Sequence, residues 1–435
     1  MAEIQAFRGL RYDMGRVGSL SDVIAPPYDV IDATLQQQLY DRSPYNVIRL
    51  ELNRETPADT EFDNRYTRAA QTLRDWQDQG TLVQDSARSL YVYHQEFEVE
   101  GRKYTRKGFM ARVRLVKFGE GVYPHEETLS GPKADRLKLL RATNTNLSQI
   151  FGLFPDEAGE VQARLDAVIG LSLPLQATDH LGVVSKMWNI SDSAAISAVV
   201  GLMSSKPIFI ADGHDRYETA LDYLNERTAA GQVKGPDDPT NYVLMMCVSM
   251  HDEGLVILPT HRLVSGVGDL TVEHLRKHLS PAFEVEVVGK GPAAAKEAWE
   301  NIESDGSQTM LGFGTVADDT WVTARLTKPE LMDTLAGEHS KDWRELAVAV
   351  LHRLVLDKLL AEKGHGPAKC QYVHLLKETT DAVAAKQCQL VALVPPATMG
   401  HVESIAGNLE KMPPKSTYFY PKLLSGLVFH TLKAN

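Results

Sequence analysis

Hydrophobic residues recur along the chain at two spacings, one typical of helices and one typical of strands. In residues 60–79, Tyr66, Ala69, Leu73 and Trp76 fall on one face of a helix. Residues 341–363 show helical spacing over a longer stretch and predict a single long helix. The pattern therefore predicts a helix in each of these two regions.

Strand-like segments occur in pairs separated by turn residues. Residues 89–99 and 103–116 are rich in β-branched and aromatic side chains and flank Gly101, which predicts a hairpin. Residues 241–250 and 255–264 have the same character and predict a second hairpin.

The C-terminal part mixes strands with helices. Residues 309–326 predict a third hairpin that turns at Asp318 and Asp319. The last stretch then alternates strand, helix, strand and helix, in residues 371–376, 379–386, 389–394 and 398–410. This mixture predicts a mixed α/β or α+β fold class.

A chain of 435 residues is too long for one compact core, so two or three domains are expected. We predict three domains. They are an N-terminal α+β region in residues 1–160, a strand–turn–helix core in residues 161–265 and a C-terminal α/β region in residues 266–435.

The overall charge of the chain limits the kinds of partner that it can attract. The chain has 46 basic and 57 acidic residues, a formal net charge of −11, and therefore no general attraction to nucleic acid or anionic membrane. Three cysteines without a paired C-x-x-C favour a reducing compartment and disfavour a thiolate zinc site. No signal peptide and no apolar stretch near the roughly 20 residues of a membrane span are visible. We expect a cytoplasmic protein with no DNA or membrane partner.

The strongest candidate site is the segment 206–221, where an apolar run ends at Asp212 and Gly213 leads into a helical pattern. The first amides of such a helix lack partners and, together with the helix dipole, favour an anion. Arg216 adds a planar fork suited to two phosphate oxygens. Asp212 could accept a proton or hold a metal ion. The structural alternative is that Asp212 caps the helix and Arg216 pairs with Glu218 or Asp222.

A second candidate lies in residues 123–136, where Ser130 or Gly131 is suited to cap a helix. His125 and Glu126 could supply an acid–base or metal-ligating pair, and Lys133 and Arg136 could contact phosphate. The alternative is an ordinary capped helix with solvated charges.

Two weaker signals follow, and several familiar motifs are absent. Residues 259–262 end a strand with His261 and Arg262, and residues 412–422 combine a diproline with aromatic residues and two lysines. The sequence contains no G-x-x-x-x-G-K-[ST], G-x-G-x-x-G, H-E-x-x-H or G-x-S-x-G.

Several of these segments together resemble a bacterial and archaeal family known as domain of unknown function 1015. The matching stretches are residues 25–31, 45–50, 125–146, 210–221, 258–263 and 412–426, which span nearly the whole chain. This family is in turn similar to ADP-dependent free serine kinases and to the ParB and sulfiredoxin phosphate-binding fold. The resemblance implies a ParB/sulfiredoxin-like phosphate-binding core with additional α/β elaborations.

The resemblance also implies roles for the turn. The kinase turn has the sequence Asp-Gly-His-His-Arg, and the corresponding residues here are Asp212 to Arg216. It implies phosphate contacts by Gly213, His214 and Arg216, base or metal work by Asp212, and Mg²⁺ with ADP or ATP as cofactors. This chain differs from the kinase turn at Asp215, where a carboxylate that can only accept hydrogen bonds replaces the second histidine.

The leading hypothesis is a nucleotide-dependent phosphotransferase for a small hydroxyl metabolite, with serine and phosphoserine as the implied pair. Asp212 or Glu126 would take the hydroxyl proton, and Mg²⁺ with Arg216 would neutralise the phosphoryl group. Two alternatives remain, a phosphoserine phosphatase and a non-catalytic nucleotide-binding switch protein. The sequence leaves the oligomeric state open.

Overall fold

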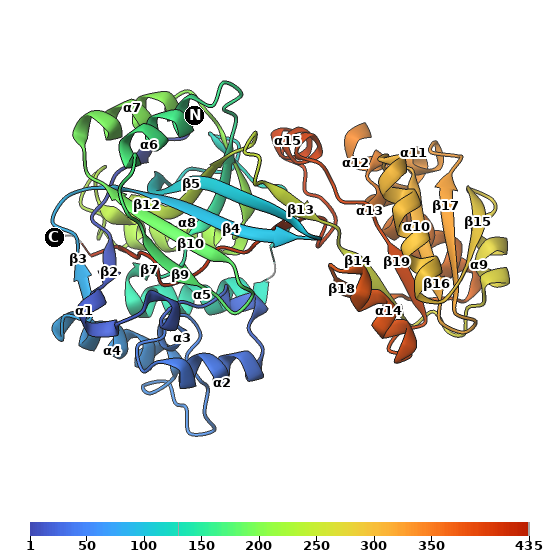
Figure 1. The fold of residues 1–435 in the computed structure, drawn as a ribbon, viewed down its shortest axis with the longest axis horizontal. Helices are drawn as coiled ribbons and strands as arrows, with labels where there is room; N and C mark the ends of the chain where they lie inside the picture. Colours follow the sequence, from blue (N-terminus) through green and yellow to red (C-terminus); the bar gives the residue numbers. More distant parts are fainter. Residues whose placement is uncertain (129, 434–435) are drawn as a thin grey trace. The chain divides into compact units, whose positions relative to one another are not determined.

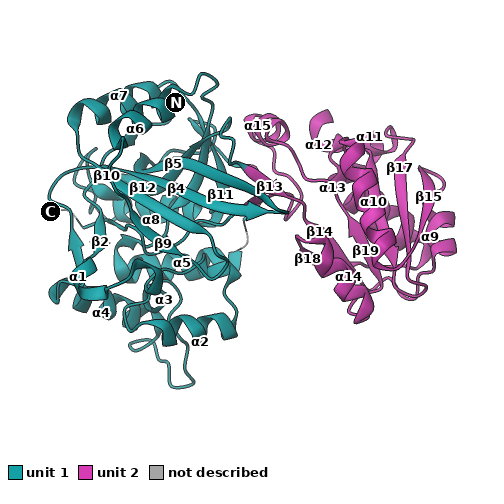
Figure 2. Cartoon of the chain, viewed as in Figure 1, with its two compact units in different colours: residues 1–124, 128–255, 421–435 teal, residues 125–127, 256–420 magenta. Residues whose placement is uncertain are grey.

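The computed structural model describes residues 1–128 and 130–433, and Leu129 of the second candidate segment lies outside the described residues. The chain forms two compact units (Figures 1 and 2). Unit 1 comprises Met1–Pro124, Thr128–Leu255 and Pro421–Asn435, and unit 2 comprises His125–Glu127 and Val256–Tyr420. The division into three domains at residues 160 and 265 stays a prediction.

Unit 1 is built on a mixed nine-stranded sheet with the order β6-β11-β8-β12-β5-β4-β10-β9, in which β1 also pairs with β5. Two small two-stranded sheets, β2-β3 and β7-β21, complete its strands. The strands are β1 (Ile4–Gln5), β2 (Leu10–Tyr12), β3 (Leu82–Gln84), β4 (Leu90–Val99), β5 (Arg102–Arg114), β6 (Val122–Tyr123), β7 (Thr145–Asn146), β8 (Ile150–Phe154), β9 (Leu175–Thr178), β10 (Val184–Ile190), β11 (Ile208–Asp212), β12 (Tyr242–Ser249) and β21 (His430–Thr431).

Figure 1 shows α6 and α7 on one side of this sheet and α2 to α4 on the other side. Apolar side chains of α6, α7 and α8 pack with those of the sheet in one buried core. The helices of unit 1 are α1 (Met14–Val17), α2 (Ala33–Arg42), α3 (Ile48–Glu51), α4 (Arg65–Asp78), α5 (Ser130–Thr143), α6 (Glu160–Ile169), α7 (Ser193–Met203) and α8 (His214–Ala229).

Unit 2 contains a six-stranded sheet in the order β15-β17-β16-β19-β14-β18 and a separate pair, β13-β20. Helices α10 and α14 pack on the sheet through a second apolar core. The strands are β13 (Val256–Leu258), β14 (His261–Ser265), β15 (Phe283–Lys290), β16 (Met310–Thr315), β17 (Thr320–Leu326), β18 (Lys369–Val373), β19 (Leu390–Leu393) and β20 (Tyr418–Tyr420). The helices are α9 (Val272–Leu279), α10 (Gly291–Asp305), α11 (Leu331–Leu335), α12 (Lys341–Glu345), α13 (Ala347–Ala349), α14 (Leu376–Ala384) and α15 (Met399–Gly407).

Most elements predicted from local pattern are present. The helix predicted in residues 60–79 is α4, which starts at Arg65 because Asn64 and Thr67 form a capping box. The first hairpin is β4-β5, and its turn residues Glu100 and Gly101 both have positive φ. The third hairpin is β16-β17, and the final alternation is β18, α14, β19 and α15.

The predicted hairpin of residues 241–250 and 255–264 is wrong. β12 lies between β8 and β5, so both of its edges already have partners. The second segment splits around Pro259 into β13, which pairs with β20, and β14, which lies between β18 and β19. The strands were predictable from composition, but their partners come from distant parts of the chain.

The single long helix predicted in residues 341–363 is also wrong. The chain leaves the helix at Leu346, whose backbone is extended with φ −63° and ψ 130°. The side chain of Gln308 accepts a hydrogen bond from the Ala347 amide, which caps a new helix start. The helix then continues through a π-helical segment, Val350–Leu360.

The fold class is mixed α/β, as expected. The more specific ParB/sulfiredoxin-like assignment stays a prediction. Among residues 1–128 and 130–433, no helix has the length and apolar character needed to cross a membrane.

Gly108 of β5 allows a close approach between β5 and β12. An added Cβ would lie 2.4 Å from the Cys247 carbonyl oxygen and 2.8 Å from Met246 Cε. We expect Gly108→Ala to lower the free energy of unfolding by about 1–3 kcal/mol, because the strands must move apart. Denaturant unfolding of the full chain measures this change.

The matched control is Gly201→Ala in α7, where a Cβ meets no atom within 4 Å. This change should be neutral or stabilising by up to about 1 kcal/mol, because alanine favours helices. A Gly108→Ala protein as stable as the parent would contradict the close strand approach.

Candidate functional site

The candidate site is built on the turn between β11 and α8 in unit 1. Buried Ile208 and Ile210 anchor β11 in the sheet, and the strand ends at Asp212. Gly213 follows with φ 90°, a left-handed conformation that favours glycine, and α8 begins at His214. The predicted strand–turn–helix is confirmed, and the positive end of the α8 dipole lies at the turn.

Arg216 folds back over this glycine. A Cβ at Gly213 would lie 2.9 Å from Arg216 Nη2, so the guanidinium lies directly against the turn. Nη1 donates to the Gln149 carbonyl oxygen at 2.6 Å, and Nη2 donates to Asp212 Oδ2 at 3.3 Å. The side chain is 14% exposed, so the guanidinium does not extend into solvent. Within residues 1–128 and 130–433, Arg216 pairs with Asp212 and not with Glu218 or Asp222.

Lys422 contacts the turn, although the sequence pattern did not identify it as a partner. Its Nζ lies 2.8 Å from Asp212 Oδ1, and its side chain is 15% exposed. The backbone around it is fixed by β4 and β5, because Arg106 Nη2 donates to the Pro421 carbonyl oxygen at 2.6 Å and Gln95 Nε2 donates to that of Lys422 at 3.1 Å. A lysine 210 positions away gives no local signal of this contact.

The two cations determine the charge state of Asp212. Burial raises the pKa of its carboxyl, but Lys422 and Arg216 outweigh burial and hold that pKa well below the ordinary value of 3.8. Asp212 is therefore an ionised carboxylate between two cations. The turn carries two carboxylates, Asp212 and Asp215, and two cations, Arg216 and Lys422, so its formal charge is balanced. The amides at the start of α8 and the guanidinium of Arg216 are the features that suit an oxyanion.

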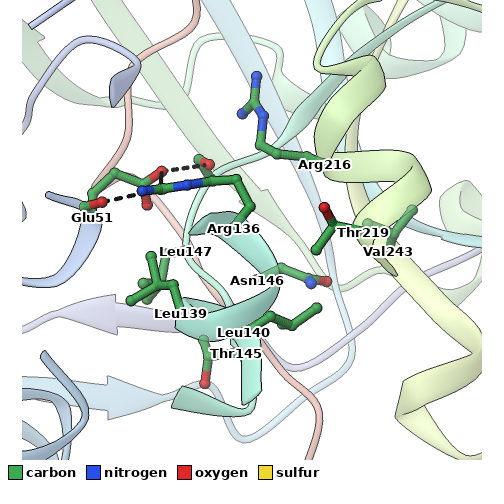
Figure 3. A pocket seen from close by; sticks show the side chains of 11 residues that line it. Glu51, Arg136, Leu139, Leu140, Thr145, Asn146, Leu147, Arg216, Thr219 and Val243 are labelled. Atoms are coloured by element: carbon green, nitrogen blue, oxygen red, sulfur yellow. Dashed lines mark hydrogen bonds and ion pairs between the residues drawn. The ribbon is translucent and has the colours of Figure 1, made fainter. Parts of the chain in front are cut away.

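A small cavity of about 50 Å³ lies beside the turn, with Arg216 and Arg136 among its lining residues (Figure 3). Arg136 is buried, donates to Asp135 Oδ2 through Nε at 2.8 Å, and donates to the Glu51 carbonyl oxygen through Nη1 at 3.0 Å. A water needs about 10–15 Å³ of such space, so the cavity holds a few waters and not a nucleotide. Any nucleoside must lie outside it.

Tyr28, which follows Pro26 and Pro27 in the chain, contacts Arg136. Its ring lies 3.9 Å from the Arg136 guanidinium. Burial raises the pKa of its hydroxyl to about 12, against the opposing effects of Arg136 and Arg216, while Asp215 raises it further. Tyr28 therefore has a neutral hydroxyl, and it lies close enough to Arg136, Arg216 and Asp215 for their charges to act on its pKa.

Lys133, predicted to contact phosphate, lies against the acidic side of α8. Its Nζ donates to Glu218 Oε2 at 2.7 Å, and Thr128 Oγ1 donates to the same oxygen. The hydrogen bond to Glu218 raises the pKa of Lys133, and Asp222 and Asp215 add to this effect. A phosphate at Lys133 would have to compete with these carboxylates, and its phosphate role stays a prediction.

His125 and Glu126 belong to unit 2. His125 is buried, its Nε2 lies 2.8 Å from Thr417 Oγ1, and its carbonyl oxygen accepts from the Met412 amide. Glu126 Oε1 accepts from the Lys415 amide at 3.3 Å. Two segments that the sequence marked separately thus lie together, and the catalytic roles of His125 and Glu126 stay predictions.

The contacts of Asp212 do not support the metal role predicted for Asp212 and Glu126, which stays a prediction. Among residues 1–128 and 130–433, no group of three or more histidine, cysteine, aspartate or glutamate side chains is arranged to hold a metal ion. Both Asp212 oxygens contact cations, which disfavours Mg²⁺ on this carboxylate.

The model of the family described as "Protein of unknown function (DUF1015)" matches residues 4–354. The chain belongs to this family. The resemblance inferred from the sequence is thereby confirmed. No curated protein matches the chain.

Three solved structures are weakly similar to this DUF1015 protein. A conserved hypothetical protein from Pyrococcus furiosus has a TM-score of 0.32 and 11% identity over 72% of this chain and 90% of that one. A variant free serine kinase in complex with ADP has a TM-score of 0.32 and 13% identity over 72% and 87%. SbnI with a C-terminal truncation, from Staphylococcus aureus, has a TM-score of 0.34 and 10% identity over 73% and 86%. Likenesses this weak do not identify a function.

The contact between Lys422 and Asp212 should stabilise unit 1 in a pH-dependent way. The folded-state pKa of Asp212 is depressed, so the stability it contributes is present above the ordinary value of 3.8 and is lost as pH falls through the folded-state pKa. We expect Lys422→Gln to cost about 1–3 kcal/mol at pH 7 and less below pH 3.8, measured by denaturant unfolding.

The control is Lys107→Gln, which breaks the more exposed pair with Asp166 in the same unit. That loss should be at most about 1 kcal/mol. Equal losses for the two variants, or a Lys422→Gln deficit that grows on acidification, would contradict the assignment.

Proposed function

We propose that this protein is a nucleotide-dependent phosphotransferase for a small hydroxyl metabolite, with serine and phosphoserine as the metabolite pair and ADP or ATP as the nucleotide. One observation carries the proposal, the convergence of Arg216 and Lys422 on the helix start that follows Asp212. The resemblance of the turn to that of free serine kinases supplies the choice of nucleotide and metabolite.

The chemistry of phosphoryl transfer fits these groups. The transferring phosphoryl group needs positioning and charge neutralisation more than a covalent nucleophile. Arg216 supplies a planar fork for two oxygens, Lys422 a point charge, and the amides at the start of α8 a third direction of approach. Because Gln149 and Asp212 already orient Arg216, little side-chain entropy remains to be lost on binding.

Asp212 suits a positioning role better than that of a general base. A carboxylate whose pKa lies well below its ordinary value is a weak proton acceptor. Its two oxygens instead hold the two cations that face the proposed phosphate. The base roles inferred for Glu126 and His125, and the requirement for Mg²⁺, stay part of the hypothesis without support from the contacts of the turn.

A second candidate function is nucleotide binding without transfer. Asp215 favours it, because this residue places a carboxylate in the first turn of α8, where the family resemblance implies a histidine. The low pKa of Asp212 favours it too, because it leaves the turn without an evident base. In this alternative, nucleotide binding serves as a signal.

Phosphorus NMR separates the candidates. Phosphoserine is incubated with the full-length protein and Mg²⁺, with and without ADP. ATP formed only in the presence of ADP supports the phosphotransferase. Inorganic phosphate formed without ADP indicates a phosphatase, and ADP line broadening without turnover indicates a binding protein. Unchanged spectra in every arm would exclude the proposal.

Arg216→Ala should weaken ADP binding by about 10- to 100-fold, because it removes a guanidinium that contacts phosphate. Isothermal titration with ADP measures the affinity, and thermal unfolding checks that the variant folds. Arg227→Ala, at the other end of α8, is the control and should bind ADP like the parent. Equal affinity of Arg216→Ala and the parent would remove the phosphate assignment.

Asp215→His should improve nucleotide use by about five- to tenfold in kcat/KM, because it removes a negative charge and adds a donor beside the proposed phosphate. Asp222→His makes the same charge change two turns along α8 and should have little effect. A loss of activity in Asp215→His would show instead that this carboxylate has a role of its own.

A further inference from the structure

Unit 1 has several cavities larger than the one beside Arg216, and the walls of one of them are rich in positive charge. Its volume is about 460 Å³, within the usual range for small-molecule sites. Five cationic side chains line it, Arg8, Arg88, Arg112, Lys234 and Lys433. Such a concentration is unusual in a chain with a net charge of −11.

These charges are poorly neutralised by the protein itself. Asp237 and Asp238 are the acidic residues of the lining. Asp238 already accepts backbone amides through both oxygens, at 2.9 Å from Lys234 and 2.9 Å from Thr240. Within residues 1–128 and 130–433, none of the five lining cations has a carboxylate within 4 Å. The cavity therefore has an excess of positive charge that would attract an anion.

The side chain of Arg112 is held in one position in the cavity wall, unlike a cationic side chain that moves freely on the surface. Its side chain is 6% exposed, and its guanidinium lies 4.2 Å from the Tyr242 ring. Nε and Nη2 both donate to Gln5 Oε1, at 3.1 and 2.6 Å. Burial lowers the pKa of Arg112, and Arg88 lowers it further, while Tyr242 and Asp237 oppose them without cancelling the effect. A buried guanidinium whose hydrogen-bond acceptor is neutral retains a desolvation cost that a bound anion would offset.

His430 lines this cavity and hydrogen-bonds to Asn146, which lines the small cavity beside Arg216. Its Nδ1 lies 3.0 Å from Asn146 Oδ1, which also accepts the Leu244 amide, so the histidine is the donor. Burial lowers the pKa of His430 to about 3, and the ring is neutral at physiological pH. Asn146 lines the small cavity beside Arg216, whereas His430 lines the basic one. The two cavities are thus distinct.

We propose that this basic cavity of unit 1 binds a small, multiply charged oxyanion through Arg112 and the cations around it. Phosphate-bearing and polycarboxylate molecules share this chemistry. The site does not depend on the function proposed for the turn.

Titration of the full-length protein with inorganic pyrophosphate and, separately, with citrate tests the site by calorimetry at low ionic strength. The double variant Arg8→Gln/Arg88→Gln removes two exposed cations of the lining. It should weaken binding of the preferred anion by about five- to tenfold, because each exposed charge contributes modestly. The control Arg42→Gln/Arg74→Gln makes the same charge change elsewhere on the surface of unit 1 and should bind like the parent.

Arg216→Ala distinguishes this site from the turn. Retained anion binding in Arg216→Ala, together with weakened binding in Arg8→Gln/Arg88→Gln, supports the proposal whatever the outcome of the kinase assay. Tighter binding of pyrophosphate identifies a phosphate ligand, and tighter binding of citrate a polycarboxylate. The proposal is overturned if neither anion binds, if the control variant is equally weakened, or if binding is lost only in Arg216→Ala.

Discussion

The carboxylate of Asp212 joins two parts of unit 1 that are 210 residues apart in the sequence. Transferring a carboxylate and two cations from water costs several kcal/mol each, and their mutual attraction offsets this only when the geometry is good. Here each oxygen of Asp212 faces one cation, Lys422 at 2.8 Å and Arg216 at 3.3 Å. These ion pairs stabilise the half-buried turn. They also place Arg216 against Gly213 and Lys422 beside Asp212, at the start of α8.

The contact explains which part of the site was predictable. Asp212, Gly213 and Arg216 lie within five consecutive positions, and a strand that ends at a glycine before a helical pattern is a local signal. Lys422 has no such signal, because its place depends on Arg106 and Gln95 holding the backbone of the last segment. Single-sequence patterns identify the turn but not the second cation.

The fold shows the same division between local and distant information. Side-chain pattern and turn chemistry identified α4 and the β4-β5 hairpin, whose contacts are close in sequence. The hydrophobic pattern did not predict the partners of β12, because both of its neighbours in the sheet, β5 and β8, come from earlier in the chain. The break at Leu346 depends on Gln308, which lies far away in sequence. In each case the missing information is a tertiary partner.

The small cavity beside Arg216 and the basic cavity beside Arg112 are neighbours in unit 1, which bears on how their ligands would influence each other. Asn146 lines the small cavity and His430 lines the basic one, and these two neutral side chains hydrogen-bond to one another. This neutral pair places no fixed charge between two bound anions, so their repulsion would be reduced only by the nearby arginines and lysines and by water and salt. Because like charges repel, an anion in the basic cavity would lower the affinity of the turn for phosphate, and by reciprocity a phosphate at the turn would lower the affinity of the basic cavity. A phosphate at the turn and an oxyanion beside Arg112 would therefore compete through charge without sharing a single contact.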